Sequence, residues 1–187
     1  MTADLQPEAT PVRKRRNPWG RVLDVLAVLV IAFVVWKLFV APRAMKGAPD
    51  AYPVPRVTYE RLGGGTFSPY DARGKVLFLD FFATWCEPCR LEMPMVERYA
   101  RAHPEVTVVA IDVGEPESLV APFAKKYHLT SVALDPSTRS QGLFQIDGFP
   151  TIVVIDPQSR IRATWTGFNP AIEMAMASAV QSVGKTP

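Results

Sequence analysis

The residues best suited to chemistry are two thiols, Cys86 and Cys89, which are the only cysteines of the chain. They follow an apolar run at residues 76–82, which is typical of a strand covered on both faces. Helical spacing of apolar residues begins at once and continues over 87–103. A CxxC pair at such a strand–helix junction favours reversible dithiol–disulfide chemistry.

The position of the pair at a helix start assigns different roles to the two thiols. The free N–H groups and the macrodipole of a helix N-terminus stabilise a thiolate. We expect Cys86 to be exposed at that end and to be the nucleophile, with Cys89 one turn inward to resolve a mixed disulfide. Pro88 presets the backbone at the helix start, and the charge of Glu87 opposes a very low thiolate pKa.

Three other readings of the cysteine pair compete with redox chemistry. A structural disulfide across two intervening residues constrains little chain. A zinc site shared across a dimer lacks nearby histidine or aspartate partners, and two cysteines with two scattered histidines make a complete four-ligand site a poor fit. Two inert buried thiols do not require a Trp-Cys-x-Pro-Cys pattern. Redox chemistry is therefore the favoured interpretation.

Two neighbours of the pair have candidate supporting roles. Asp80 lies six residues before Cys86 inside the apolar run, and burial without a partner raises the pKa of a carboxyl group. Such a group can accept the proton of Cys89 as that thiol attacks; the alternative is an aspartate hydrogen-bonded to neighbouring backbone. Trp85 is expected to pack beside the dithiol and shape its surface, or else to be an ordinary core aromatic.

Residues 78–94, FLDFFATWCEPCRLEMP, resemble the membrane-anchored TlpA/ResA-like thiol–disulfide oxidoreductases of bacteria. The resemblance covers roughly residues 60–185 and implies an α/β, thioredoxin-like fold, a mixed central sheet flanked by helices. It also implies that Gly148-Phe149-Pro150-Thr151 is the family's cis-proline loop. Phe149 and Pro150 would then face the dithiol and bind the substrate peptide.

Two acidic residues are interpreted through the same resemblance. Asp80 matches the buried carboxylate of thioredoxins, although the membrane-anchored relatives often carry asparagine there. Glu92 lies three residues after Cys89 on the same side of the helix. It matches an acid that ResA-like proteins link to the proton balance of the thiols and to substrate recognition; the alternative is a solvated helix residue.

The resemblance implies an extracytoplasmic enzyme that reduces disulfides in exported proteins, where thiols otherwise become oxidised. It further implies apocytochrome c, with its CxxCH thiols, as substrate and a membrane electron transporter of the DsbD/CcdA type as donor. No cofactor and no metal are expected. The alternatives are a DsbA-like disulfide donor and a copper-binding chaperone of thioredoxin-like fold. The chain is short for the helical insertion of the former, and neither His103 nor His128 is placed as the ligand of the latter.

The N-terminal part of the sequence predicts a membrane anchor. Residues 1–21 form a basic tail, and Val22–Val40 is an apolar run of nineteen residues, which as a helix reaches about 28 Å, enough for a bilayer core. Because the basic cluster precedes the run, we expect a single-pass protein of the bacterial cytoplasmic membrane with a cytoplasmic N-terminus and a periplasmic catalytic domain. A cleaved signal peptide is the alternative, although its apolar region is normally shorter.

The remaining sequence divides into a linker and one domain. Residues 1–46 carry a net charge of +5 and residues 47–187 a net charge of −2, so the folded part lacks the basic excess of a nucleic-acid-binding domain. The prolines and glycines of residues 41–65 predict a linker, in which Val54, Val57 and Tyr59 alternate as in an edge strand. The catalytic domain is assigned to residues 66–187.

Within that domain, apolar spacing predicts strands and helices in alternation. The expected strands are 76–82, 107–113, 151–155 and 161–166, and the expected helices are 87–103, 117–127 and 170–183. A short helix is expected within 137–146. His103 and His128 are interpreted as the residues that end the first two helices.

Overall fold

The computed structural model describes residues 18–35 and 46–183, which belong to two separate units. The first unit contains the helix α1 (Pro18–Val35), whose side chains at residues 22–32 are exposed. Within the described ranges, none of the helices combines the length and the apolar character that crossing a membrane requires. Residues 1–17 of the predicted tail, 36–40 of the predicted membrane span and 41–45 of the predicted linker lie outside the described residues.

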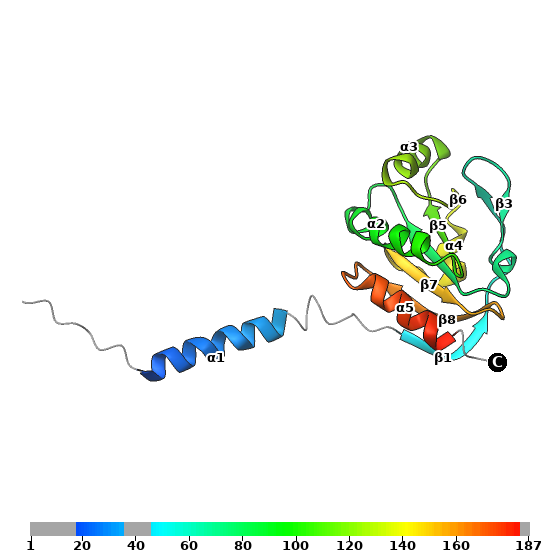
Figure 1. Ribbon diagram of the computed structural model, residues 1–187. Coiled ribbons are helices and arrows are strands. Elements are labelled where there is room, and N and C mark those ends of the chain that lie inside the picture. Colours follow the sequence, from blue (N-terminus) through cyan, green and yellow to red (C-terminus); the bar gives the residue numbers. More distant parts are fainter. Residues whose placement is uncertain (1–17, 36–45, 184–187) are drawn as a thin grey trace, which may run out of the picture. The chain divides into compact units, whose positions relative to one another are not determined.

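The second unit is built on one mixed sheet, in which the strand order is β1-β8-β7-β4-β5-β6-β2-β3 (Figure 1). The central strands run parallel: β4 (Leu77–Phe82), β5 (Thr107–Val113) and β6 (Val132–Asp135). Antiparallel strands extend the sheet beyond β4: β7 (Thr151–Ile155), β8 (Arg160–Thr166) and β1 (Lys46–Pro53). Two short antiparallel strands extend it beyond β6: β2 (Tyr59–Arg61) and β3 (Thr66–Phe67).

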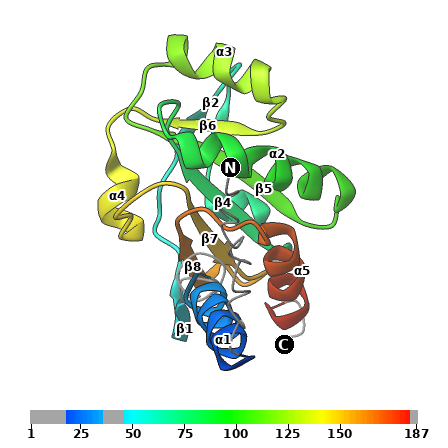
Figure 2. The same ribbon diagram turned by 90° about the vertical axis from the view of Figure 1, so that its left-hand side faces the viewer.

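Helices cover both faces of the sheet. They are α2 (Glu87–Ala102), α3 (Glu117–Tyr127), α4 (Arg139–Phe144), α5 (Ile172–Val183) and the 3-10 helix η2 (Pro69–Ala72). Figure 2 shows α2 and α5 beside each other and α4 on the other side of the strands. This arrangement confirms the predicted α/β, thioredoxin-like class, a mixed sheet flanked by helices.

The central strand β4 is buried along its whole length, as its unbroken apolar sequence predicts. Successive side chains point to opposite faces of the sheet. Leu79 and Phe81 enter one apolar cluster with Phe144 of α4. Phe78 enters the cluster that packs against α2 and α5, and Phe82 the one that contains the cysteines and α3. Asp80 alternates with Phe78 and Phe82 along β4, and its side chain therefore lies on the same face as theirs, the face that α2 covers.

Two stretches of the predicted linker are strands of the sheet, which corrects its assignment as a spacer. Residues 46–53 pair with β8, and residues 59–61 pair with β6. Val54, Val57 and Tyr59 are buried in the cluster under α4, so the alternation at these positions did indicate packing. The prolines of this stretch indicated a linker, but a strand at the edge of a sheet also tolerates proline. The glycine run at 63–65 adopts positive φ and forms the turn between β2 and β3.

The other predicted elements are found within one or two residues of their expected ends. His103 and His128 end α2 and α3, as predicted, and His128 does so with a left-handed backbone. The short helix expected within 137–146 is α4. The strand β6 was not predicted, because four residues before the Asp135-Pro136 turn give too little periodicity to distinguish a strand.

Candidate active site

The two cysteines lie where β4 passes into α2, at the predicted junction. They form a disulfide, with 5.3 Å between their Cα atoms. The Sγ atom of Cys86 also accepts a hydrogen bond from the backbone N–H of Cys89, at 3.2 Å. Cys86 is therefore the N-cap residue of α2, and the same N–H group is placed to stabilise a Cys86 thiolate once the disulfide is reduced.

Cys86 is less exposed than the sequence predicts. Its exposed fraction is 4% and that of Cys89 is 1%, so both side chains are buried although Cys86 is the more accessible. The physical reason is that the pair belongs to an apolar cluster with Phe82 and Met93. A partner can reach the disulfide only at the small accessible surface of Cys86, in agreement with its predicted role as nucleophile.

Three loops meet at the carboxyl end of β4. Phe81 pairs with Thr151, and Phe82 pairs with Asp112. The loop before β7 and the loop after β5 therefore lie at the same edge of the sheet as the cysteines. The loop before β7 contains the Phe149–Pro150 peptide bond, which is cis, as the resemblance implies.

An aromatic pair flanks the cysteines. Trp85 is 67% exposed, and its ring meets that of Phe149 edge to face, with 5.9 Å between the centroids. Trp85 is therefore a surface residue beside the disulfide and not a core aromatic. Pro150 is buried, and its carbonyl accepts a hydrogen bond from Gly167 N–H at 2.8 Å. Of the two predicted substrate-binding residues, Phe149 therefore contacts Trp85, whereas Pro150 is buried behind the surface.

Asp80 is buried beneath α2, with an exposed fraction of 2%. Its Oδ1 atom has no hydrogen-bond partner in the described part of the chain, so for this oxygen the backbone-bonded alternative does not apply. Burial, and then the nearby Glu92 and Glu97, raise the pKa of Asp80 well above its usual value. The carboxyl group of Asp80 is therefore a stronger base than an exposed aspartate.

Glu92 is also buried, at 2% exposure, and is not a solvated helix residue. Its Oε2 atom accepts the backbone N–H of Asn169, at 2.7 Å. Burial raises the pKa of Glu92 to about 7, against the lowering effect of that hydrogen bond. Asn169 follows Gly167, which contacts Pro150, so Glu92 connects α2 to the loop beside the cis-proline.

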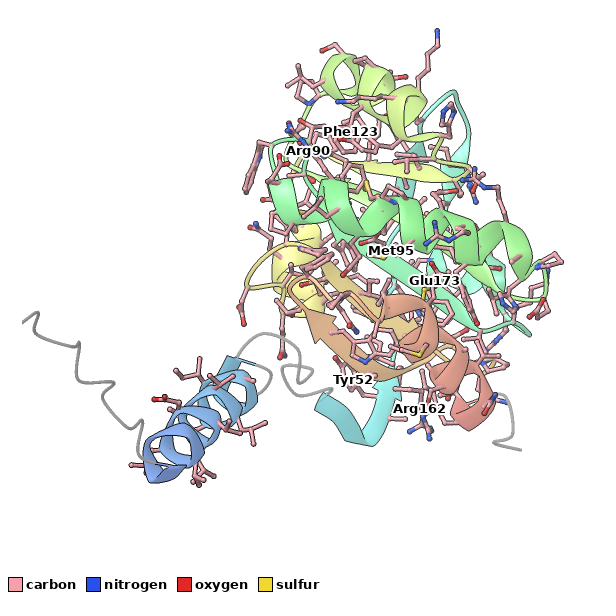
Figure 3. All side chains as sticks on the ribbon, turned by 60° about the vertical axis from the view of Figure 1, so that its left-hand side comes forward. Tyr52, Arg90, Met95, Phe123, Arg162 and Glu173 are labelled. Atoms are coloured by element: carbon pink, nitrogen blue, oxygen red, sulfur yellow. A yellow bond between two sulfur atoms is a disulfide. The ribbon has the colours of Figure 1, made fainter. Side chains whose placement is uncertain are left out.

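The first turn of α2 carries an exposed ion pair. The carboxylate of Glu87 lies 2.9 Å from the guanidinium of Arg90, and Pro88 occupies the first turn as predicted. Arg90 also donates two hydrogen bonds to the carbonyl oxygen of Thr84, at 2.7 and 3.1 Å. Figure 3 shows Arg90 at the N-terminal end of the helix.

Sequence reasoning missed three residues at this edge: Thr84, Asp112 and Glu115. The Glu115 carboxylate accepts hydrogen bonds from both the backbone N–H and the hydroxyl of Thr84. Asp112 is the last but one residue of β5 and is fully buried. A signal was available, because polar residues at the carboxyl ends of adjacent parallel strands meet at one edge.

This domain also has a cavity of about 500 Å³. It is lined by Arg56, Val57, Thr58, Ser68, Tyr70 and Arg139. None of the predicted site residues belongs to its lining. Over the described ranges 18–35 and 46–183, no three His, Cys, Asp or Glu side chains are grouped to hold a metal ion.

Comparison with known proteins agrees with this geometry. Residues 51–164 match the AhpC/TSA family, a range that includes the cysteines and the cis-proline loop. In structure, the chain is similar to a protein assigned as the thiol:disulfide interchange protein DsbE of Chlorobium tepidum, with a TM-score of 0.67. That similarity covers 75% of this chain and 99% of the other at 24% sequence identity, and it shows the fold.

Two curated relatives are closer in sequence. The thiol-disulfide oxidoreductase ResA of Geobacillus thermodenitrificans is 36% identical over 158 residues, which cover 83% of this chain and 90% of that protein. ResA of Bacillus subtilis is 30% identical over 162 residues, covering 83% and 88%. The resemblance found in the sequence is confirmed: the chain belongs to the AhpC/TSA family and, within it, to the ResA-like thiol–disulfide oxidoreductases.

Proposed function

We propose that this oxidoreductase works as an extracytoplasmic reductant, whose Cys86/Cys89 dithiol reduces disulfides in exported proteins. The acidic surroundings of the cysteines carry this proposal: Asp80 and Glu92 are buried beneath and within α2, and Glu87 lies between the two thiols in sequence. Negative groups oppose ionisation of a thiol. A dithiol whose thiolate is less stabilised is a stronger reductant, because a stabilised reduced form is what makes such a pair oxidising.

The reaction consists of two thiol–disulfide exchanges. The thiolate of Cys86 attacks one sulfur of the substrate disulfide, which forms a mixed disulfide and releases the other substrate sulfur as a thiolate that takes a proton from water. Cys89 then loses its proton and attacks the Cys86 sulfur, which releases the second substrate thiol. The protein ends as the Cys86–Cys89 disulfide, the state of this structure, and two electrons have passed to the substrate.

In this scheme Asp80 receives the proton of Cys89. A buried carboxylate is a strong base, and the raised pKa of Asp80 in the oxidised protein agrees with a carboxyl group that holds a proton when the reaction is complete. Glu92, whose charge also bears on Asp80, adjusts the proton balance of the pair. Its pKa near 7 places its titration within the physiological range.

For the substrate we propose apocytochrome c, whose CxxCH thiols must be reduced before haem attachment, and for the donor a membrane transporter of the DsbD/CcdA type. The family resemblance supports both. Phe149 and Pro150 supply the peptide-binding loop, and the exposed ring of Trp85 adds apolar surface beside it. An aromatic surface next to a buried disulfide suits a protein substrate that presents an extended segment.

The reduction potential of the full-length protein tests the direction of electron flow. The protein is equilibrated in thiol redox buffers, and the reduced fraction is counted by alkylation of the two cysteines. A potential near or below about −250 mV supports the reductant. A potential near about −120 mV makes the protein a DsbA-like disulfide donor instead. Absence of a reversible couple, together with tight Cu(I) binding, supports the copper chaperone and contradicts both redox roles.

The proposed location needs its own test. We propose that residues 1–21 are cytoplasmic, that residues 22–40 anchor the chain in the bacterial cytoplasmic membrane, and that the catalytic domain is periplasmic. The basic tail and the aromatic residues near the ends of the apolar run support this. Protease added outside intact spheroplasts should then digest the catalytic domain and leave the tail protected. Protection of the whole chain contradicts this location.

A further inference from the structure

Thr84, two residues before Cys86, is held by charged side chains on both sides. The Glu115 carboxylate accepts its backbone N–H and its hydroxyl, the latter at 2.6 Å. The Arg90 guanidinium donates twice to its carbonyl oxygen, at 2.7 and 3.1 Å. All three polar groups of Thr84 are thus bonded to an ionic group, and charge-assisted hydrogen bonds are roughly twice as strong as neutral ones.

The sheet brings Glu115 to this place from thirty-one residues away in sequence. β5 runs parallel to β4 and ends beside it, with Asp112 opposite Phe82. The chain then turns at Gly114, where φ is 94° and a Cβ atom would come within 3.2 Å of the Thr138 side chain. Glycine is therefore required at this turn. Glu115 follows it and is itself buried, at 8% exposure.

Asp112 lies behind Glu115 and is fully buried. Its Oδ1 atom accepts the backbone N–H of Glu115 at 3.2 Å, while Oδ2 has no partner among the residues that the structure describes. Burial first, and then the hydrogen bond and charge of Glu115, raise the pKa of Asp112 to about 8. Near neutral pH, Asp112 therefore keeps its proton.

The neighbouring strand and helix add two further charges. Asp135, at the end of β6, also raises the pKa of Asp112. Arg139 of α4 lies 3.8 Å from Asp135 and partly balances it. Apart from Glu115, these are the charged groups that bear on Asp112 from the elements packed around it.

We propose that Glu115 is a positioning residue of the thiol–disulfide exchange: it holds Thr84 so that Cys86 keeps the geometry in which it reacts. Glu115 and Arg90 together form what we term the Thr84 clamp. Because Cys86 is nearly enclosed, a small displacement of the preceding loop removes the accessible surface at which it is attacked. The proposal applies to electron flow in either direction and does not depend on the proposed reductant role.

The first test replaces the carboxylate. Glu115→Gln retains the side-chain shape but loses the charge and one of its two acceptors. Glu117→Gln, at an exposed position two residues later, is the matched control. We expect the second-order rate constant of the reduced full-length protein with glutathione disulfide to fall at least tenfold in Glu115→Gln and to stay within twofold in the control. A folded Glu115→Gln protein with the wild-type rate overturns the proposal.

The second test uses Thr84 itself and remains decisive if Glu115→Gln fails to fold. Thr84→Val keeps the shape and removes the hydroxyl donor, whereas Thr84→Ser keeps the donor and removes a methyl group. We expect several-fold slower exchange in Thr84→Val and a rate close to wild type in Thr84→Ser. Equal rates in the two variants contradict a role for the bond to Glu115.

The third test follows the clamp without any thiol titration. In the oxidised full-length protein the cysteines cannot ionise, so a pH titration of the Thr84 amide by NMR reports the surrounding carboxyl groups. We expect a transition with a midpoint near pH 8, because ionised Asp112 repels the Glu115 carboxylate. Asp112→Asn should abolish this transition, since an amide side chain does not ionise. The same transition in Asp112→Asn excludes Asp112 as the group that controls the clamp.

Discussion

The two faces of the central sheet bury different kinds of side chain. On the face under α4, Leu79 and Phe81 of β4 meet Phe144 in a wholly apolar cluster. On the face under α2, the same strand places Asp80, and β5 places Asp112 beside Phe82. The carboxyl group buried on this first face, that of Asp135, accepts a hydrogen bond from the backbone N–H of Ser140 in α4. The second face buries the carboxyl groups of Asp80 and Asp112, and burial of such groups destabilises a core. Proteins usually keep them only at functional sites, and these two lie on the side of the dithiol.

The largest effect on stability is expected on the apolar face. Phe81→Ala removes a fully buried ring whose centroid lies 5.1 Å from that of Phe144. The free energy of unfolding should fall by about 3–5 kcal/mol, measured by urea denaturation. The reduction potential of the folded protein should not change. A shifted reduction potential in folded Phe81→Ala would show that the two faces do not have separate roles.

On the opposite face, Asp80→Asn should have the reverse effect on stability. The pKa of Asp80 is raised in the folded protein, so the unfolded chain releases this proton near pH 4 while the folded protein keeps it. Wild-type stability therefore falls as pH rises above about 4, and the asparagine variant lacks that loss. We expect the variant to be more stable than the wild type at pH 7 and of similar stability below pH 4, measured by urea denaturation at several pH values.

The same substitution should slow catalysis, because the proton acceptor for Cys89 is lost. General-base contributions are typically about 100-fold or more, and the effect should appear in the rate at which the mixed disulfide is resolved. If the Asp80→Asn protein is more stable than the wild type but resolves the mixed disulfide more slowly, the carboxyl group is retained for its role in the reaction. An unchanged exchange rate contradicts the proton-acceptor role, and Asp80 would then destabilise the fold without a known function.

Glu92→Gln should change the free energy of unfolding by less than Asp80→Asn does, and over a defined range of pH. The folded pKa of about 7 lies above the ordinary value of 4.5, so wild-type stability falls between these two pH values and is level above them. The variant should gain up to about 3 kcal/mol over the wild type across that window. The thiol pKa values should also move. If thiol titration and exchange rate both match the wild type, Glu92 only anchors the loop at Asn169.

The smallest effect is expected where an ion pair lies outside both clusters. Arg98 of α2 and Glu173 of α5 form an exposed salt bridge. Exposed pairs of this kind contribute about 0–1 kcal/mol. Glu173→Gln should therefore change the free energy of unfolding by less than about 1 kcal/mol at any pH between 5 and 9, and leave exchange unaffected. A large change would show that the α2–α5 contact helps to position the dithiol.

Local features made most of the site predictable. The Cys86/Cys89 spacing, the buried strand before it and the helix after it are all adjacent in sequence, so periodicity and helix-end chemistry were sufficient. Trp85 was expected beside the dithiol, but only the structure shows that it is exposed against Phe149. The exposure of Cys86 was overestimated because the cluster that encloses it is assembled from several elements.

The boundaries of the domain were less predictable. Lys46–Pro53 joins the sheet by pairing with β8, more than a hundred residues later. Its prolines read locally as a spacer, and an edge strand is the one place in a sheet where they are tolerated. No short-range pattern distinguishes these two cases, since the deciding partner is far away in the chain.

The sequence by itself determined the reactive pair, most of the strands and helices of the domain, and the acidic character of the residues around the thiols. Each of these depends on side-chain type or on spacing within a single element. Only the tertiary structure decided that Glu115 bonds Thr84, that Asn169 bonds Glu92 and that Asp80 lacks a partner for one oxygen among the described residues. Those contacts join residues dozens of positions apart, and strand register and helix packing decide which of the many possible partners come within hydrogen-bonding distance.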